Sequence, residues 1–442
     1  MGRRDEMSAW DESIVAFNRL ETRTWDLLAA LGWASHPDPF ATVRDTLREL
    51  TGRQHILFAP SGQCAIAQVL SLLPQREVVM PAYMCHEVKR AAQVAGKRVI
   101  YVDAGKNSVN ATSAEFAEAA RPGRILLAAH VYGVPTDIEA ICELGRSRDC
   151  VTIEDAVPAF GGRRHGRLLG TFADVGVFSF QQSKRLSAFR GAVIVVNNSE
   201  ILDPVKLGSR RLVETQRAMP VRELVQALVQ NFATIPWVYR TLTRPLLPLR
   251  ETLPQLLRRY RREPAPGRAD HQAAEARPVP RTPYYTREMH PYQAELVLRM
   301  LRRIEAIREQ IAHLAAIYLE AFRGTPIATF LPPGCDNGGL MRFPIAFLGK
   351  DRSEILRRAL KRGLYLQVIW PRLLPEASKH EQFPNALWAA QNVTLLPLYT
   401  ALSPESAARL AQRVIEIETN APAIQELTPV SLASSQDFAL HS

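Results

Sequence analysis

The chain has 442 residues, of which 47% are hydrophobic and 22% charged, so it is long enough for two compact domains and has the composition of a soluble globular protein. Five scattered cysteines without a C-x-x-C pair argue against a disulfide framework or a zinc site, and without an apolar signal or membrane-spanning stretch we predict a cytoplasmic protein. The net charge of +11 indicates acidic partners, but no motif supports nucleic-acid binding.

The first 200 residues divide into two patterns. Residues 1–55 are predicted to be an N-terminal helical segment, because Leu20, Trp25, Leu28 and Leu31 recur near the helical period. From 56 to 203, short apolar strands alternate with helical stretches. This alternation predicts an α/β domain with a large, doubly wound, mostly parallel sheet, in which ligands bind beyond the carboxyl ends of the strands.

The strand–helix pattern stops at residues 204–283, which we predict to be a basic helical and proline-rich insertion. Between Asp203 and Arg281 there are 15 Lys/Arg against 7 Asp/Glu. An amphipathic helix is expected over 221–242, followed by the arginine-rich run 258–262 and a proline-rich stretch over 264–283.

A smaller C-terminal α/β domain is predicted over 284–425. One long helical pattern covers 294–322, strands are expected at 341–348 and 364–370, and helices at 353–362 and 405–417. Residues 426–442 are predicted to be a polar tail.

Two ionisable residues follow predicted strands in a way that suits one cofactor. Lys184 comes after the apolar run 175–178, and Asp155 ends the run that begins at Val151. A lysine amine can form a Schiff base and a carboxylate can keep a pyridine nitrogen protonated, so the pair suits pyridoxal phosphate (PLP). Taken singly, Lys184 reads as a solvated surface lysine, and Asp155 as a cap or as the partner of a base such as Arg163.

A phosphate site is predicted after the strand at 56–58. Ser61, Gly62 and Gln63 open a helix there, and a hydroxyl with backbone N–H groups at a helix N-terminus suits a phosphate, although an ordinary serine N-cap has the same sequence. Ser179 could donate to the same phosphate or to backbone. His130 also ends a strand, where a lone histidine is more often a hydrogen-bonded structural residue, and no His/Cys cluster has metal-ligand spacing.

These segments, in this order, resemble the DegT/StrS family of sugar aminotransferases, which are PLP enzymes of fold type I. The matching segments include Ser61-Gly62-Gln63-Cys64-Ala65, Pro81-Ala82-Tyr83, His130-Val131-Tyr132-Gly133, Glu154-Asp155-Ala156, and Phe178-Ser179-Phe180 with Lys184. The resemblance covers about residues 40–200 and 287–418. It implies that Lys184 forms the Schiff base, that Asp155 pairs with the ring nitrogen, and that the phosphate is held by Ser61, Gly62, Gln63 and Ser179.

The chain departs from the family's pattern at two positions of the predicted cofactor site, near Tyr285-Thr286-Arg287, where the partner subunit's asparagine usually stands, and in the length of the insertion. Pro158 stands where the family usually has a glutamine that contacts the ring hydroxyl. Cys85, next to His86, stands where an aromatic side chain usually stacks on the ring, so Cys85 is the predicted cofactor contact at that position. The presence of Lys184 disfavours the family's dehydratase branch, which has a histidine there.

The resemblance implies a homodimeric PLP-dependent aminotransferase that moves an amino group, typically from glutamate, to a keto sugar. The sugar would be nucleotide-linked and would serve polysaccharide, glycolipid or natural-product biosynthesis. The alternatives are another PLP reaction on an amino or sugar substrate, or a degenerate PLP-fold protein with a binding or regulatory role, which Pro158 and Cys85 motivate. The insertion would be a lid or dimer arm, a peripheral membrane contact, or a solvated basic excursion.

Overall fold

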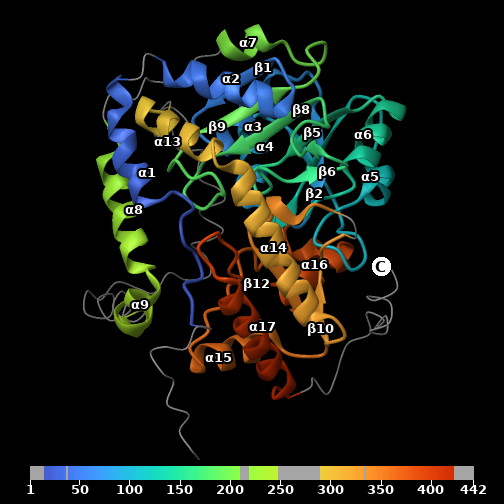
Figure 1. Cartoon of the computed structure of the whole chain (residues 1–442). Coiled ribbons are helices and arrows are strands. Elements are labelled where there is room, and N and C mark those ends of the chain that lie inside the picture. The colour runs from blue at the N-terminus through green and yellow to red at the C-terminus, as the bar shows by residue number, and fades with distance from the viewer. Residues whose placement is uncertain (1–13, 36–37, 210–218, 247–288, 333–334, 423–442) are drawn as a thin grey trace, which may run out of the picture.

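The computed structural model describes residues 14–35, 38–209, 219–246, 289–332 and 335–422 (Figure 1). The arginine-rich run 258–262, the proline-rich stretch 264–283 and the tail 426–442 lie outside these described residues.

A seven-stranded sheet forms the centre of the molecule, with strand order β1-β9-β8-β5-β4-β2-β3. The strands are β1 (His55–Ala59), β2 (Glu77–Pro81), β3 (Arg98–Val102), β4 (Arg124–Ala129), β5 (Val151–Asp155), β8 (Val175–Ser179) and β9 (Ala192–Val196). β9 runs antiparallel to β1 and β8, and every other neighbouring pair is parallel. The predicted mostly parallel sheet is therefore confirmed, with one strand reversed. A short hairpin, β6 (Arg163–Arg164) and β7 (Arg167–Leu168), follows β5.

Helices cover both faces of this sheet, as the doubly wound prediction requires. In β4, Ile125 and Leu127 pack in the core that contains α3 (Gly62–Leu72) and α4 (His86–Val94). Leu126 and Ala128 point the other way, into the core under α5 (Ser113–Ala119) and α6 (Ile138–Ser147). Farther along that second face lie α2 (Pro39–Thr51) and α13 (Pro291–Leu301), which pack on each other and on β9. The short α7 (Pro204–Ser209) follows the last strand.

The C-terminal part is a smaller α/β unit around a three-stranded antiparallel sheet, β10-β11-β12. Its elements are β10 (Ile327–Thr329), β11 (Phe343–Phe347), β12 (Thr394–Leu396), α14 (Ile304–Phe322), α15 (Arg352–Lys361), α16 (Pro384–Asn392) and α17 (Pro404–Thr419). Figure 1 shows α14 running from the large sheet down to this unit. The predicted helix over 294–322 is two helices, α13 and α14, separated at Arg302 and Arg303.

The predicted strand at 364–370 is wrong. The segment makes a single β-bridge, Gln367 opposite Leu395, and is otherwise irregular. Trp370 leaves the small sheet and stacks on Tyr132 of the large domain, with ring centroids 4.6 Å apart. Trp370 is therefore buried against the neighbouring domain, so the hydrophobicity of this segment did not indicate a ladder.

The N-terminal segment is less helical than predicted. Helix α1 covers only Thr24–Ala29, a 3₁₀ turn follows over Ala30–Ser35, and residues 14–23 are irregular but largely buried. Thr22 Oγ1 donates a hydrogen bond to Ser187 O at 2.6 Å. Residues 14–23, called the strap below, therefore pack in an irregular conformation against the large domain. This contact buries their apolar side chains without a helix.

The described part of the insertion is mainly one helix, α8 (Val221–Ala233), which lies beside α1 (Figure 1). The predicted helix over 221–242 is interrupted after Ala233, and the chain continues as α9 (Pro236–Val238) and a π-helical turn over Tyr239–Thr243. Pro236 accounts for the interruption, because it has no N–H to donate to the preceding turn. Among the described residues, every helix is too short or too polar to cross a bilayer.

Candidate active site

Lys184 lies on the loop that joins β8 to β9. Backbone bonds fix the loop, with Lys184 N donating to Gln181 O at 2.8 Å and Ala188 N to Phe180 O at 2.9 Å. The next side chain, Arg185, is buried and donates from Nη1 to Glu21 Oε1 at 2.5 Å. A buried, charge-assisted contact beside the lysine limits the positions that its amine can take.

The structure brings Lys184, Asp155 and Cys85 close enough to interact electrostatically. Asp155 ends β5, the strand next to β8, and is only 3% exposed. Burial raises its pKa, which the Val157 N–H, the Lys184 charge and His130 partly oppose. Burial also lowers the pKa of the Lys184 amine, while Cys85 and Asp155 raise it. A buried acid and a half-buried amine with pKa values shifted toward their neutral forms are typical of catalytic sites.

The loop before α3 lies next to the end of β8, as the phosphate prediction requires. A Cβ on Gly62 would lie 3.2 Å from both Ser179 Cβ and Val157 Cγ2, so the helix N-terminus packs closely on that strand end. Ser61 Oγ accepts from Cys64 N at 3.2 Å and caps the helix. Gln63 is buried, and its Nε2 has no hydrogen-bond partner among the described residues. A buried unpaired donor costs free energy, and an acceptor such as a phosphate oxygen would satisfy it.

Cys85 and Pro158 occupy the positions where the chain departs from the family's pattern. Cys85 is the N-cap residue of α4 and is half-buried. Burial raises the pKa of its thiol, although the nearby Lys184 charge lowers it. A neutral thiol behaves as a small apolar side chain. Pro158 is buried and, as a proline, has no N–H to donate.

His130 has a structural position. Its Nδ1 accepts from Thr136 N at 3.1 Å, so the proton is on Nε2, which lies 2.9 Å from Glu154 Oε1. Glu154 is fully buried and also accepts from the N–H groups of Gly170 and Phe172. The ring therefore links β4 and β5 behind Asp155.

An aromatic cluster that the sequence reasoning did not single out lies beside the site. The hydroxyls of Tyr83 and Tyr132 are 2.5 Å apart, and both rings contact Trp370. Gly133, with φ of +89°, lets this loop approach the C-terminal unit, since a Cβ there would lie 2.7 Å from Met341 N. Met341 Sδ in turn lies 3.9 Å from Lys184 Nζ. Tyr83 and Tyr132 lie in segments that match the family, but nothing in the sequence indicated that both would contact Trp370.

Arg342 is a second residue that sequence reasoning missed. It is buried, its Nη2 donates to Asn18 Oδ1 at 2.6 Å, and its guanidinium lies 5.3 Å from the centre of the Phe17 ring. Burial and the adjacent Arg185 lower its pKa to about 10. Its charge also lowers the pKa of Lys184. The N-terminal strap thus reaches the edge of the candidate site.

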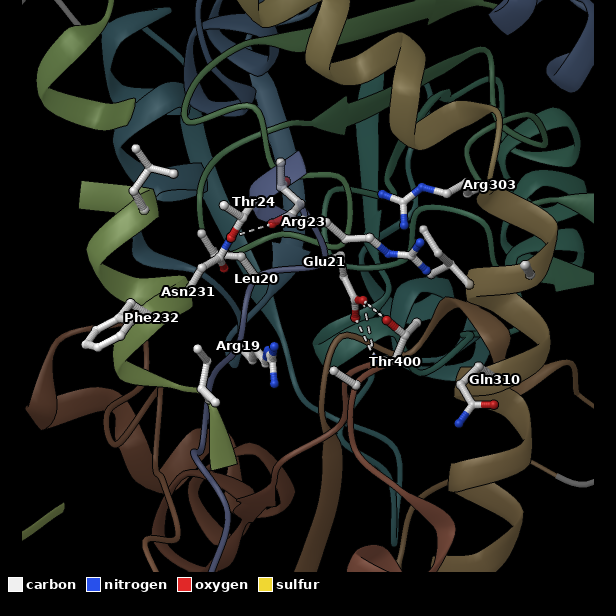
Figure 2. Close-up of a pocket in the computed structure, with 16 residues that line it drawn as sticks. Arg19, Leu20, Glu21, Arg23, Thr24, Asn231, Phe232, Arg303, Gln310 and Thr400 are labelled. Atoms are coloured by element: carbon white, nitrogen blue, oxygen red, sulfur yellow. Dashed lines mark hydrogen bonds between the residues drawn. The ribbon is translucent and has the colours of Figure 1, made fainter. Parts of the chain in front are cut away.

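A cavity of about 780 Å³ is lined in part by Glu21 (Figure 2), the carboxylate that pairs with Arg185. Its walls come from residues 19–24, α8, the beginning of α14 and residues 400–401. Glu21 faces this cavity and accepts from Thr400 Oγ1 at 2.5 Å. In the described ranges, no group of three or more His, Cys, Asp or Glu side chains is placed to hold a metal ion.

Comparison with known proteins gives a match to one family model. The model described as the DegT/DnrJ/EryC1/StrS aminotransferase family matches residues 26–218 and 261–415. GDP-perosamine synthase of Escherichia coli O157:H7 is 30% identical over 128 residues, which are 29% of this chain and 35% of that protein. A UDP-N-acetyl-3-dehydro-alpha-D-glucosamine 3-aminotransferase of Acidithiobacillus ferrooxidans is 30% identical over 157 residues, 34% of this chain and 42% of that protein. The matches therefore span about a third to two fifths of these relatives.

Solved structures share the fold over most of the chain. The putative sugar aminotransferase Spr1654 of Streptococcus pneumoniae, in its PMP form, superposes with a TM-score of 0.68 at 16% identity, covering 92% of this chain and 99% of that one. Helicobacter pylori PseC, an aminotransferase of pseudoaminic acid biosynthesis, gives a TM-score of 0.67 with the same identity and coverage. The fold is therefore that of fold-type I aminotransferases.

Proposed function

Because this chain belongs to the DegT/DnrJ/EryC1/StrS aminotransferase family, we propose that it is a PLP-dependent aminotransferase acting on a keto sugar, with glutamate as the amino donor. The observation that carries the proposal is that a buried carboxyl, Asp155 at the end of β5, lies close enough to the amine of Lys184, on the loop after the adjacent strand β8, for each to shift the other's pKa. The nucleotide-linked form of the sugar and a homodimer belong to the same proposal, supported by the names of the relatives and by the resemblance.

The residues at the site fit PLP. When bound, PLP supplies an electron sink for the carbanion left after loss of a proton. Lys184 would hold it covalently, and the lowered pKa of its amine favours the neutral form that acts as nucleophile and base. Asp155 would keep the ring nitrogen protonated, because a cation beside it favours its ionised form.

The remaining contacts position the cofactor. Ser61, Gly62, Gln63 and Ser179 would hold the phosphate at the N-terminus of α3, where Gln63 Nε2 gains the acceptor that it lacks. Cys85 would contact the ring as a neutral thiol. Lys184 Nζ would also act as the base that takes a proton from the amino-bearing carbon of the donor, and as the acid that gives the proton back.

The absorption spectrum of the protein with PLP tests this function. We expect a yellow band in the wild type and in Lys379→Ala, an exposed control lysine, and no such band in Lys184→Ala. Glutamate should then bleach the band as the cofactor takes up the amino group. A band that glutamate leaves unchanged would favour the degenerate binding protein, and no band in the wild type would contradict PLP binding.

A membrane-peripheral position in the cytoplasm is a further part of the proposal. The outer face of α8 carries Val221, Val225, Val229 and Phe232, each more than half exposed, and Trp237 is 59% exposed nearby. Glu223, the single acid of α8, lies on another side and pairs with Arg190. In sequence, residues 247–262 follow the described part of the insertion and contain five arginines and one glutamate. An exposed apolar stripe in a basic segment of the chain suits an anionic bilayer surface.

A further inference from the structure

The cavity beside α8 has an excess of positive charge. Three arginines line it, Arg19, Arg23 and Arg303, against one carboxylate, Glu21. Glu21 is already paired with Arg185, so it offsets little of the positive charge of the other arginines. The cavity is therefore suited to an anion.

The arginines keep hydrogen-bonding capacity for such an anion. Within the described part of the chain, Arg19 makes no side-chain hydrogen bond or ion pair, and Arg23 makes no ion pair. Arg303 Nη2 pairs with Asp26 Oδ2 at 2.5 Å, but its buried Nε has no partner among these residues. Figure 2 shows Arg23 and Arg303 extending into the same region. An anion bound between them would offset the repulsion of their charges.

An exposed apolar groove adjoins the cavity at Phe232. This residue of α8 lines the cavity and also lines a groove of about 310 Å³, which it forms with Val229, Val238 and Leu242 among others. Val229, Phe232 and Leu242 are each more than half exposed. A ligand that fills both the cavity and the groove therefore needs an anionic group joined to a hydrocarbon part.

The groove opens on the face of α8 that is proposed to contact a bilayer. Val225, Val229 and Phe232 stand at positions i, i+4 and i+7 of the helix, so they share one face, and Val229 and Phe232 also line the groove. At a bilayer surface, phosphate groups lie directly above hydrocarbon chains. The arginines and the groove offer matching partners side by side.

We propose that the cavity binds the phosphate headgroup of an anionic phospholipid, with the phosphate against Arg19, Arg23 and Arg303 and the acyl chains along the groove at Phe232. This inference rests on the membrane-peripheral part of the proposed function, and it names the lipid chemistry that the surface would recognise. The volume of about 780 Å³ is within the range of pockets that enclose a small organic group.

The proposed lipid site lies beside the loop that carries Lys184 without including that residue. Lys184 does not line the cavity, so the lipid would not compete with PLP for the amine. Glu21 and Thr22 of the cavity wall bond Arg185 and Ser187 of the loop. A bound lipid would therefore lie against the segment that supports the lysine loop.

Calorimetric titration with dioctanoyl phosphatidic acid, kept below the concentration at which it forms micelles, tests the proposal. The protein is first saturated with PLP, so that the phosphate site at α3 is occupied. We expect saturable binding in the wild type, and about tenfold weaker binding in Arg19→Gln and in Arg23→Gln, as for loss of one charge-assisted bond. The matched control is Arg302→Gln, an exposed arginine next to Arg303 that does not line the cavity, and it should bind as the wild type does.

Two further ligands separate a lipid from other anions. Glycerol 3-phosphate carries the phosphate without acyl chains, and dioctanoyl phosphatidylcholine carries the chains with a zwitterionic headgroup. We expect each to bind at least about tenfold more weakly than the phosphatidic acid, because each lacks one of the two sets of contacts. Phe232→Ala should weaken binding of the phosphatidic acid, whereas Leu360→Ala, at an exposed leucine that lines neither the cavity nor the groove, should not.

Several results would overturn the proposal. These are no saturable binding of the phosphatidic acid, equal weakening by Arg302→Gln, or phosphatidylcholine binding as tightly as phosphatidic acid. Glycerol 3-phosphate that binds as tightly as the lipid would assign the cavity to a soluble phosphate compound instead.

Vesicle flotation keeps the failure of the membrane-peripheral position distinct from the failure of the lipid site. A wild type that floats with anionic vesicles but does not bind the monomeric lipid would keep the membrane contact and overturn the lipid site. Binding of the monomeric lipid that depends on Arg19 and Arg23, without flotation, would support the lipid site and contradict the membrane-peripheral position. If the chain does not bind PLP, this arginine dependence still reports on the cavity, because the α3 site contains none of these arginines.

Discussion

Burial determines the protonation of the two residues at the centre of the candidate site. Asp155 ends β5 and Lys184 lies on the loop that follows β8, and the loss of water disfavours the charged form of both. Their mutual attraction opposes this effect without cancelling it, since the pKa of Asp155 stays raised and that of Lys184 stays lowered. Asp155 is thus suited to a cationic group bound beside it, which would favour its ionised form, and Lys184 is suited to act as a neutral amine.

This arrangement gives the cofactor-free protein a pH-dependent stability. Because the folded-state pKa of Asp155 is raised, its contribution to stability is full below the unfolded pKa of about 3.9 and is lost as pH rises through the folded pKa. Asp155→Asn removes this titration. We therefore expect the Tm of Asp155→Asn, relative to the wild type, to increase between about pH 4 and pH 7.

Thermal unfolding of the cofactor-free proteins across this pH range provides the measurement. Asp45→Asn, at an exposed position of α2, is the matched control and should show no such trend. A difference between Asp155→Asn and the wild type that does not vary with pH would contradict the raised pKa.

At the scale of elements, the N-terminal strap and α8 together support the lysine loop. Gln182 Nε2 donates to Gln230 Oε1 of α8 at 3.0 Å, and Arg190 at the far end of the loop pairs with Glu223. Thr22 of the strap bonds Ser187 from its side chain and Asn231 from its backbone. Helix α8 of the insertion therefore contacts both ends of the loop that carries Lys184. It also contacts the strap, which in turn bonds the middle of that loop.

We expect Asn231→Ala to lower the free energy of unfolding by about 1–3 kcal/mol, because it removes a buried hydrogen bond and leaves Thr22 O without that donor. Gln226→Ala, an exposed position on the same helix, is the control and should change stability by less than about 0.5 kcal/mol. Denaturant unfolding of both variants measures the difference. Equal effects would mean that α8 does not brace the strap.

At the scale of the whole molecule, the outer face of α8 carries four apolar side chains that are more than half exposed, Val221, Val225, Val229 and Phe232. We expect the wild type to float with vesicles that contain phosphatidylserine, less so at high salt, and not with neutral vesicles. The double variant Val225→Asp with Val229→Asp should lose this binding, because it places charges in the apolar stripe. Leu360→Asp, at a leucine of α15 that is 58% exposed, is the matched control.

Light scattering of the same variants distinguishes a subunit interface from a membrane contact at the outer face of α8. If the double variant is monomeric where the wild type is dimeric, the stripe is a subunit contact and the membrane proposal is wrong. If both have the same mass and differ in flotation alone, the stripe contacts lipid.

The sequence predicted the large domain well because its signals are local. Alternation of apolar strands and helices indicates a parallel sheet, and the residues that end those strands, Asp155 among them, share one edge for geometric reasons. The strand predicted at 364–370 was wrong because an apolar run does not say which surface buries it, and here Trp370 packs on Tyr132. The roles assigned to the site residues remain predictions, namely those of Lys184, Asp155, Ser61, Gly62, Gln63, Cys85 and Ser179.

By itself, therefore, the sequence determined the α/β class and the candidate chemistry at the strand ends, since both depend on residues close together in the chain. The tertiary structure alone decided the pairing of Arg185 with Glu21, the arginine-lined cavity and the exposed face of α8. Arg185 and Glu21 are 164 residues apart, and no local pattern encodes which distant segments meet. Such contacts form because each segment must bury its own apolar residues, and the fold as a whole sets where that burial is available.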